Sequence, residues 1–366
     1  DESRVYEAVG AGLALLGGPD RFVKPGENVL LKPNMLAGNA PQKAVTTHPA
    51  VFKAVAKHLQ AAGARLTYGD SPGFGRADAV ARQAKLSEVA DALNIPLADF
   101  SVGRTVSFPE GRLIKQFTLA AGVLDAAGIV SLPKLKTHAL TRMTGAVKNQ
   151  FGCIPGLLKG EFHARLRELE PFVQMLVDLT RFLKPRLYVM DAIVAMEGNG
   201  PRGGTPRPVS ALLLSSDPVA LDAAACVMLN LDPDLVPTIR VGEAFGLGTR
   251  QAHLVGQPLE GFVVRDFKAN REIKKDTAVL PKPAAWVMRK YVVSRPVINH
   301  DQCTRCGTCV KVCPAQPKAL SFRDGDKTKP PAYDYDRCIR CYCCQELCPE
   351  HAISVKKTRL GQWMHL

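Results

Sequence analysis

Short apolar runs alternate with longer amphipathic segments along the chain before residue 280. The apolar runs predict buried strands at residues 28–34, 64–73, 128–134, 186–193 and 210–217. The amphipathic segments predict helices at residues 49–62, 77–93, 171–183 and 218–229. Strands that alternate with helices are typical of a mostly parallel sheet covered by helices on both faces, so we expect an α/β fold here.

Polar side chains gather where several of these predicted strands end. Ligands of open α/β sheets bind in the crevice at the carboxyl ends of the strands, so this shared placement predicts a single cleft. The residues that we expect to bind substrate there are Lys32, Asn34, Asp70, Ser71, Lys134, Lys136, Asn149 and Asn199.

The stretch SLPKLKTHALTRMTGAVKNQFGCIPG, residues 131–156, is the most basic part of this predicted cleft. Extended over residues 131–167, it carries seven Lys and Arg against one acid, Glu161. Lysines at a strand end beside glycines favour a cradle for carboxylate or phosphate. A solvated basic loop, a docking surface for a redox partner and a nucleic-acid site are the alternatives.

Three residues of the cleft are candidates for catalysis: His138, Lys148 and Glu197. The imidazole of His138 titrates near neutrality and suits a general acid, although a single histidine is commonly structural. Lysines such as Lys148 would stabilise negative charge that develops on reduction. Glu197 and Asn199 lie in a glycine-rich loop that matches neither a P-loop nor a dinucleotide fingerprint, and they would hold substrate or a cation unless the loop is only a tight turn.

Isolated acids and thiols have simpler interpretations. Asp191, Asp217 and Asp222 supply hard oxygen ligands for a metal, or they cap the helices that follow them. Cys153 and Cys226 stand alone in the sequence and are expected to be buried thiols.

The 366 residues carry 48 Lys and Arg against 34 Asp and Glu, a net charge of +14 that attracts anions. The charge is spread along the chain, and no known nucleic-acid module stands out, which argues against nucleic acid as a partner. No apolar run reaches the length of about 18 residues that a membrane span needs. The first residue is Asp1 and not Met, so a removed targeting segment stays open.

Nine of the eleven cysteines lie between Cys303 and Cys348. They form two runs with the spacing C-x-x-C-x-x-C-x-x-x-C-P, which is the bacterial pattern for 4Fe–4S clusters, and the fourth cysteine of each run ligates the other cluster. We therefore expect two 4Fe–4S clusters. The ligands of the first are Cys303, Cys306, Cys309 and Cys348, and those of the second are Cys338, Cys341, Cys344 and Cys313.

This C-terminal segment resembles bacterial two-cluster ferredoxins over about residues 296–356, and Cys343 fits none of their ligand positions. Two such clusters relay single electrons. From Pro296 onward the segment has 11 Lys and Arg and 7 Asp and Glu, a net charge of +4, which suits docking of an acidic carrier such as a ferredoxin or flavodoxin. Because such clusters decay in oxygen, we expect a reducing, anaerobic, cytoplasmic setting.

The motifs LKPNM, YGDSPG, LPKLKTH, TGAVKNQFGCIPG, DAIVAMEGNGPRGG and SSDPVALD precede this segment. Together with the fused two-cluster ferredoxin, they resemble the iron–sulfur proteins of domain of unknown function 362, over nearly the whole chain. The resemblance implies an α/β domain at residues 1–280, a connector at 281–295 and a ferredoxin domain at 296–366. It implies no reaction.

A shorter likeness joins His138, Gly145, Lys148 and the Pro155-Gly156 pair to a stretch of the nickel-pincer lactate racemases. In those enzymes the histidine and the lysine serve the site for a 2-hydroxy acid. The spacing therefore implies a related fold or site for this chain, without implying the same chemistry.

The leading hypothesis is an oxidoreductase that passes electrons from a low-potential carrier through the clusters to an anionic substrate or cofactor in the basic cleft. One alternative is a non-catalytic electron-transfer subunit or cluster-assembly factor. Another is a racemase-like or isomerase enzyme whose clusters are structural. The sequence leaves open whether a flavin or a further metal occupies the cleft, and it does not specify the oligomeric state.

Overall fold

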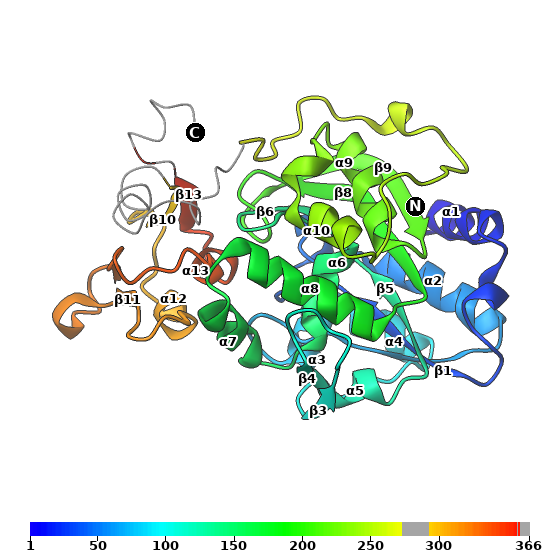
Figure 1. The fold of residues 1–366 in the computed structure, drawn as a ribbon, viewed down its shortest axis with the longest axis horizontal. Helices are drawn as coiled ribbons and strands as arrows, with labels where there is room; N and C mark the ends of the chain where they lie inside the picture. Colours follow the sequence, from blue (N-terminus) through cyan, green and yellow to red (C-terminus); the bar gives the residue numbers. More distant parts are fainter. Residues whose placement is uncertain (273–292, 357, 359–366) are drawn as a thin grey trace. The chain divides into compact units, whose positions relative to one another are not determined.

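The computed structural model describes residues 1–272, 293–356 and 358 (Figure 1). The chain divides into two compact units: the first comprises residues 1–159 and 170–269, and the second comprises residues 160–169 and 270–366. The predicted connector at 281–295 lies outside the described residues except for 293–295. We call the first the α/β unit and the second the cysteine-rich unit, and we describe each by itself.

A seven-stranded sheet forms the centre of the α/β unit, with the strand order β2-β1-β5-β8-β6-β7 and with β9 paired to β8. The pairs β1–β2, β1–β5, β5–β8 and β6–β8 are parallel, whereas β6–β7 and β8–β9 are antiparallel. The predicted mostly parallel sheet is therefore confirmed. The strands are β1 (Asn28–Pro33), β2 (Arg65–Tyr68), β5 (Gly128–Leu132), β6 (Lys134–His138), β7 (Arg142–Thr144), β8 (Leu187–Glu197) and β9 (Thr205–Ser215).

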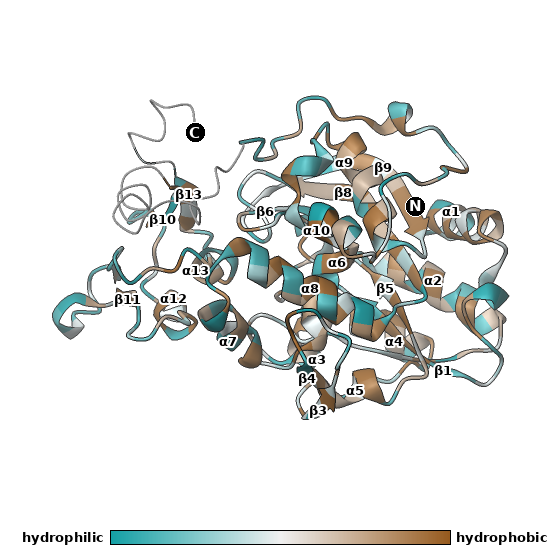
Figure 2. Ribbon diagram, in the orientation of Figure 1, coloured by the Kyte–Doolittle hydropathy of each residue, from teal (hydrophilic) through white to brown (hydrophobic). Residues whose placement is uncertain are grey.

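Both faces of this sheet are buried, as the alternation of side chains along β8 shows. Leu187 and Val189 pack into a core formed with β1, β2 and the helices α1, α2 and α4. Tyr188 and Met190 point to the opposite face and pack against α9 and α10. Figure 2 shows the matching hydrophobic colouring on β9 and on α9. The helices are α1 (Glu2–Leu15), α2 (Pro49–Ala61), α3 (Ala77–Gln83), α4 (Leu86–Ala92), α5 (Ala121–Leu124), α6 (Ala146–Asn149), α8 (Leu169–Leu183), α9 (Pro218–Met228) and α10 (Pro237–Ala244).

The basic stretch of residues 131–156 is part of the sheet and not a solvated loop. Its first half forms β6 and β7, and every residue of these two strands is buried. Pro133 separates β5 from β6 because a proline has no N–H for the ladder, and both strands pair with successive parts of β8. The lysines of β6 are therefore buried in a strand that lies between β8 and the edge strand β7.

Two further differences from the sequence prediction are local. The single helix predicted over residues 77–93 is two helices, α3 and α4, because Lys85 adopts the left-handed conformation with φ 59° and redirects the chain. The hairpin of β3 (Gly103–Ser107) and β4 (Gln116–Ala120) was not predicted. The β3 strand is mostly exposed, so it lacks the alternating apolar pattern that marks a half-buried strand.

The cysteine-rich unit is built from short elements. Strand β10 (Arg295–Ile298) pairs antiparallel with β13 (Ile353–Lys356), and β11 (Leu320–Ser321) pairs antiparallel with β12 (Ala332–Tyr333). One-turn helices, α12 (Thr308–Lys311) and α13 (Cys343–Glu346), lie within the two cysteine runs and contain the third cysteine of each. Helix α7 (Leu158–Arg165) begins in the α/β unit, and its residues from Gly160 onward belong to the cysteine-rich unit.

Candidate functional site

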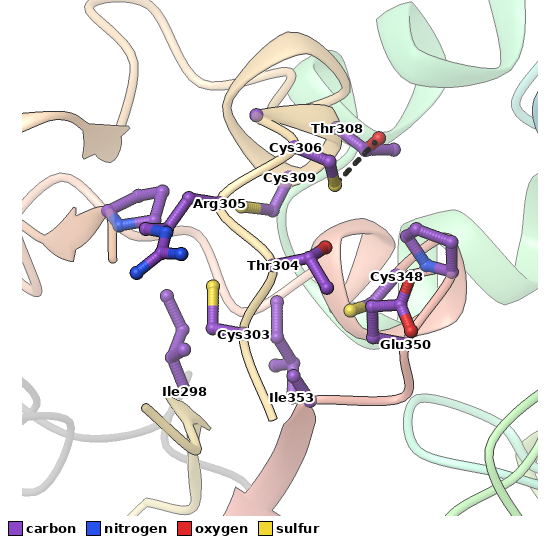
Figure 3. A pocket seen from close by; sticks show the side chains of 14 residues that line it. Ile298, Cys303, Thr304, Arg305, Cys306, Thr308, Cys309, Cys348, Glu350 and Ile353 are labelled. Carbon is purple, nitrogen blue, oxygen red and sulfur yellow. Dashed lines mark hydrogen bonds between the residues drawn. The ribbon is translucent and has the colours of Figure 1, made fainter. Parts of the chain in front are cut away.

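The cysteine-rich unit contains two hollows lined by cysteines. The first is lined by the thiols of Cys303, Cys306, Cys309 and Cys348 (Figure 3). Cys306 is exposed at its rim, and the Thr308 hydroxyl lies 3.4 Å from its Sγ. The structure thus brings together three cysteines of the first run and the last cysteine of the second run, as the spacing predicts.

The second hollow is lined by the complementary set, Cys313, Cys338, Cys341 and Cys344. Cys338 and Cys344 are buried, and Tyr333 places its hydroxyl 3.2 Å from the Cys344 Sγ. Cys343 is also buried, but it lines neither hollow. The second hollow therefore has the same four-thiol composition as the first, with a more enclosed setting.

Four thiols around one hollow form a donor set that fits an iron–sulfur cluster. Burial, together with the charges of Cys348 and its neighbours, raises the pKa of Cys309 to about 12. Four adjacent thiolates would repel one another in such a place, and bound iron removes that repulsion because it coordinates the deprotonated sulfur. The chemistry that such a cluster supplies when bound is the uptake and release of single electrons.

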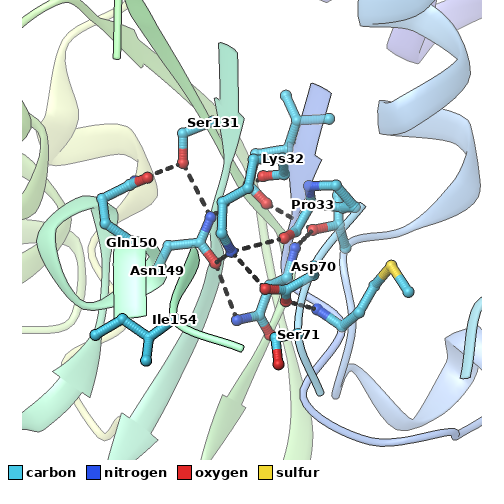
Figure 4. A network of polar contacts seen from close by, with 12 residues as sticks. Lys32, Pro33, Asp70, Ser71, Ser131, Asn149, Gln150 and Ile154 are labelled. Carbon is cyan, nitrogen blue, oxygen red and sulfur yellow. Dashed lines mark hydrogen bonds and ion pairs between the residues drawn. The ribbon is translucent and has the colours of Figure 1, made fainter. Parts of the chain in front are cut away.

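The α/β unit places most of the predicted substrate-binding residues in one buried polar network at the carboxyl ends of β1 and β5 (Figure 4). Lys32 is fully buried, and its Nζ donates to the Asp70 Oδ1 at 2.8 Å, the Pro33 carbonyl at 3.1 Å and the Asn149 Oδ1 at 3.2 Å. The second carboxylate oxygen of Asp70 accepts a hydrogen bond from the Met35 N–H at 2.6 Å. The charge of Lys32 is therefore neutralised inside the protein.

Asn34 and Asn149 extend the network across the sheet. The Lys136 Nζ donates to the Asn34 Oδ1 and to the Val45 carbonyl, both at 2.7 Å, and the Asn34 Nδ2 donates to the Asn149 Oδ1 at 3.1 Å. The Asn149 Nδ2 donates in turn to the Ser131 hydroxyl at 2.9 Å. Gly152 allows this packing, because a Cβ there would lie 1.8 Å from the Asp70 Oδ1.

Lys134 belongs to a second buried ion pair. Its Nζ lies 2.7 Å from the Asp191 Oδ2, and both side chains are at most 2% exposed. The same oxygen accepts a hydrogen bond from the His48 N–H at 2.8 Å. His48 also caps α2, where its Nδ1 accepts from the Ala50 N–H at 3.2 Å. Burial lowers the pKa of His48, while the charge of Asp191 acts in the opposite direction.

Ser71 contacts a lysine that the sequence analysis did not single out. The Lys159 Nζ donates to the Ser71 hydroxyl at 2.6 Å and to the carbonyls of Ser71 and Ile154 at 3.0 Å each. The Gly156 N–H donates to the same hydroxyl at 2.9 Å. Burial is the main cause that lowers the pKa of Lys159 to about 8, and the charges of Lys32 and Lys148 act in the same direction. The charge of Asp70 acts in the opposite direction, so Lys159 is influenced by two lysines and one carboxylate.

The three predicted catalytic residues occupy different surroundings. His138 is buried at the end of β6, and its Nδ1 accepts from the backbone N–H groups of Leu140 at 3.0 Å and Thr141 at 3.3 Å. Any proton that this imidazole donates must therefore come from Nε2. Lys148 is half-buried on α6, with its Nζ 5.3 Å from the centre of the Phe151 ring.

The third, Glu197, ends β8 and accepts a hydrogen bond from the Lys268 N–H at 3.0 Å, while Arg207 lies 4.0 Å from its carboxylate. Asn199 follows in the glycine-rich turn and is half-buried. The structure thus gathers Lys32, Asn34, Asp70, Lys136 and Asn149 directly, and it gives Glu197 other partners.

The three aspartates considered as metal ligands have structural roles. Asp191 pairs with Lys134, and Asp217 caps α9 through the N–H groups of Val219 and Ala220. Asp222 accepts from the Ala146 and Val147 N–H groups, and burial raises its pKa to about 7. Cys153 and Cys226 are fully buried, as expected, and burial raises the pKa of Cys153 to about 12.

Sequence reasoning missed Ser131, Gln150, His48 and Lys159 as members of these networks. Ser131 sits within an apolar strand pattern, and Gln150 lies inside the basic stretch of residues 131–156 but is uncharged. The signal for Lys159 was its place among the seven basic residues of 131–167, but spacing alone did not separate it from surface lysines. The buried Oε1 of Gln150 has no hydrogen-bond partner among the described residues.

Comparison with known proteins identifies both units. The family described as "Domain of unknown function (DUF362)" matches residues 29–227, and the family described as "4Fe-4S dicluster domain" matches residues 295–354. The "Thylakoid-associated protein sll1697" of Synechocystis sp. is 42% identical over 240 residues, which cover 65% of this chain and 74% of that protein. The C-terminal ferredoxin-like region, its capacity to bind iron–sulfur clusters and its capacity for electron transfer are thereby shown.

Two solved structures resemble the fold. The lactate racemase apoprotein of Thermoanaerobacterium thermosaccharolyticum aligns with a TM-score of 0.41 and 11% identity, over 61% of this chain and 54% of that one. A protein from Thermotoga maritima aligns with a TM-score of 0.36 and 14% identity, over 59% and 55%. The chain thus spans little more than half of each solved chain, and scores below 0.5 support no argument about function. In the described part of the chain, no helix is long and apolar enough to cross a membrane.

Proposed function

Because the chain belongs to the family of domain of unknown function 362 and carries a 4Fe-4S dicluster domain, we propose that it is an iron–sulfur oxidoreductase. In this proposal, electrons pass from a low-potential carrier through two 4Fe–4S clusters to an anionic substrate or cofactor in the α/β unit. The observation that carries the proposal is the pair of hollows, each lined by four thiols in the interleaved combination. Such a pairing suits a relay of single electrons.

The anion is proposed to bind where lysines outnumber carboxylates. The charges of Lys32, Lys148 and Asp70 all act on Lys159, and Lys32 already forms the ion pair with that carboxylate. The Lys159 Nζ donates to the neutral oxygens of Ser71 and Ile154, and burial is the main cause that lowers its pKa, against the opposing charge of Asp70. A carboxylate or phosphate beside Lys148 and Lys159 would add negative charge next to these two ammonium groups.

The chain's own residues would then have separate tasks. Lys148 and Lys159 bind and orient the anion and stabilise negative charge that develops on reduction. The Lys32–Asp70 pair and Asn149 hold the strand ends in place beneath them. The His138 Nε2 is the proposed proton donor, because its Nδ1 is occupied by two backbone N–H groups.

The proposed electron donor is an acidic carrier, a ferredoxin or flavodoxin, that docks at the first hollow. Arg305 is exposed and lines this hollow beside the exposed Cys306, although Glu350 lines it as well. Replacement of Arg305 by Glu should slow reduction by such a carrier, and the loss should shrink as salt rises, because screening removes electrostatic steering. The proposal includes a reducing cytoplasmic setting, since low-potential clusters decay in oxygen.

Anaerobic reoxidation tests this function. The purified protein is reduced, and carboxylate and phosphate compounds are screened for oxidation of its clusters by absorbance. At least one compound should reoxidise the wild-type protein, and Lys148→Ala and Lys159→Met should slow that reaction by roughly tenfold or more. Lys57→Ala, an exposed lysine on α2, is the control that should keep the wild-type rate.

The alternative of a non-catalytic electron-transfer subunit is favoured by one observation. Lys32 and Lys134 are buried and paired with carboxylates, so their charges serve the fold. If the reduced clusters persist with every anion, and an acidic redox protein co-purifies with the chain, the oxidoreductase proposal is wrong and this alternative replaces it.

A further inference from the structure

The second hollow has a tyrosine directed at one of its cysteines. Tyr333 ends the short strand β12, and its hydroxyl oxygen lies 3.2 Å from the Sγ of Cys344 on α13. Cys344 is buried, and Tyr333 is half-buried. Neither the cysteine spacing nor the family description assigns a role to this phenol.

The direction of this hydrogen bond follows from the chemistry of a ligand thiolate. A metal-bound cysteine has lost its proton and can only accept, so the phenol must be the donor. A tyrosine phenol carries its proton at neutral pH and can therefore donate it. A hydrogen bond to an ionised acceptor is stronger than one between neutral groups.

The surrounding side chains hold Tyr333 in place. Its ring stacks on that of Tyr335, with a distance of 5.2 Å between centroids and an interplanar angle of 13°. The Tyr335 hydroxyl donates to the Pro296 carbonyl at 2.9 Å, and the Arg295 guanidinium lies 4.4 Å from the Tyr335 ring centre. Tyr333 is also paired with Leu320 across β11 and β12. The Tyr333 ring is thus held by a stack whose other member donates its own hydroxyl to a backbone carbonyl.

We propose that Tyr333 is a positioning residue that donates a hydrogen bond to the Cys344 thiolate and raises the reduction potential of the centre at the second hollow. The inference rests on the proposed presence of a cluster in each hollow. Reduction adds one electron and makes the centre more negative, so a donor on its sulfur stabilises the reduced state more than the oxidised state. The effect should be confined to one centre, because the hydroxyl contact at the first hollow comes from Thr308 beside an exposed cysteine.

The pair Tyr333→Phe and Tyr335→Phe tests this inference. Both changes remove one phenolic oxygen from the same ring stack, but only the first removes the contact with a cysteine. Iron and sulfide are counted first, and each centre is then titrated anaerobically by electron paramagnetic resonance. Y333F should lower the midpoint potential of one centre by about 59 mV. For a one-electron couple, this shift lowers the ratio of reduced to oxidised centre roughly tenfold at a fixed applied potential. Y335F should leave both potentials in place.

The outcomes separate the two proposals. Half the expected iron in the wild-type protein would contradict the proposed second cluster, and the inference about Tyr333 would fall with it. With both clusters assembled, an unchanged potential in Y333F, or an equal shift in Y335F, would overturn the inference.

A second measurement covers the case in which Y333F fails to assemble. Wild-type protein made with 3-fluorotyrosine has more acidic phenols, which are stronger donors, and the potential of one centre should rise. If fluorination moves neither potential, or moves both equally, Tyr333 does not set the potential of the second centre.

Discussion

The buried lysines Lys32 and Lys134 of the α/β unit each pair with an aspartate of the same unit, whereas the buried thiols of the cysteine-rich unit line hollows that need a group from outside the chain. The Lys32–Asp70 and Lys134–Asp191 pairs close their own charge balance. The eight thiols of the two hollows balance theirs only with bound iron. The α/β unit should therefore fold without a ligand, and the cysteine-rich unit should depend on its clusters.

The same difference locates the proposed chemistry. The buried ion pairs hold the strand ends in position. Because Lys32 and Lys134 already face a carboxylate, an added anion would gain little electrostatic attraction from either lysine. The corner formed by Ser71, Gly156 and Lys159 differs, because its ammonium group contacts neutral oxygens. In this one place the α/β unit is like the hollows, because the proposed anion would come from outside the chain and supply the charge opposite to the Lys159 ammonium.

Loss of one ligand should give the largest effect. Cys344→Ser should remove about half of the bound iron and the hydrogen-exchange protection of residues 295–354, because the cluster holds this part of the chain together. Cys343→Ser is the matched control, since its thiol lines neither hollow, and it should keep the full iron content. Protection of β1 and β8 should be unchanged in both variants, and its loss in Cys344→Ser would contradict the independence of the α/β unit.

Breaking the buried ion pair should have the next largest effect. Asp70→Ala leaves the ammonium of Lys32 without its carboxylate and removes the bond to the Met35 N–H, so the free energy of unfolding should fall by about 3–5 kcal/mol. Hydrogen exchange at β1 in a urea series measures it, because a chain with two units does not unfold in one step. Asp78→Ala, which removes exposed ion pairs with Arg76 and Arg82, should change the result little.

A methyl group at Gly152 should have a moderate effect. Gly152→Ala places a Cβ 1.8 Å from the Asp70 Oδ1 and 2.8 Å from the Lys32 Nζ, so the strand ends must move apart. We expect a loss of about 1–3 kcal/mol in the free energy of unfolding, as for other overpacked sites. Gly261→Ala meets nothing within 4 Å and should be neutral. Equal stability of the two variants would show that the polar network accommodates the added methyl group, although the contacts around Gly152 indicate that it does not fit.

The smallest effect should be a change in how the free energy of unfolding depends on pH. The pKa of Lys159 is lowered from 10.5 to about 8 in the folded protein, so between these values the unfolded chain binds more protons than the folded one. The stability of the wild-type protein relative to Lys159→Met should therefore be constant below pH 8 and rise between pH 8 and 10.5. Chemical denaturation of both proteins across this range measures the difference, and parallel profiles would contradict the lowered pKa.

The repeated spacing of eight cysteines was enough to predict the iron–sulfur unit, and apolar runs were enough to predict the mostly parallel sheet. Cysteine ligands within one run lie three or four residues apart, so local geometry places them. Only the interleaving of Cys313 and Cys348 needs the two runs to meet, and the family pattern already implies it. The hairpin of β3 and β4 was missed because an exposed strand leaves no apolar period to detect.

The sequence by itself determined which residues are basic, which strands end in polar groups and which cysteines form two matched sets. Only the tertiary structure decided that Lys32 meets Asp70, 38 residues away, and Asn149, 117 residues away. It likewise decided that Lys159 donates a hydrogen bond to Ser71, and that Glu197 accepts one from the Lys268 N–H. The physical reason is that the residue type alone gives a side chain its charge. The partner that neutralises this charge depends on which strands lie next to each other in the folded sheet.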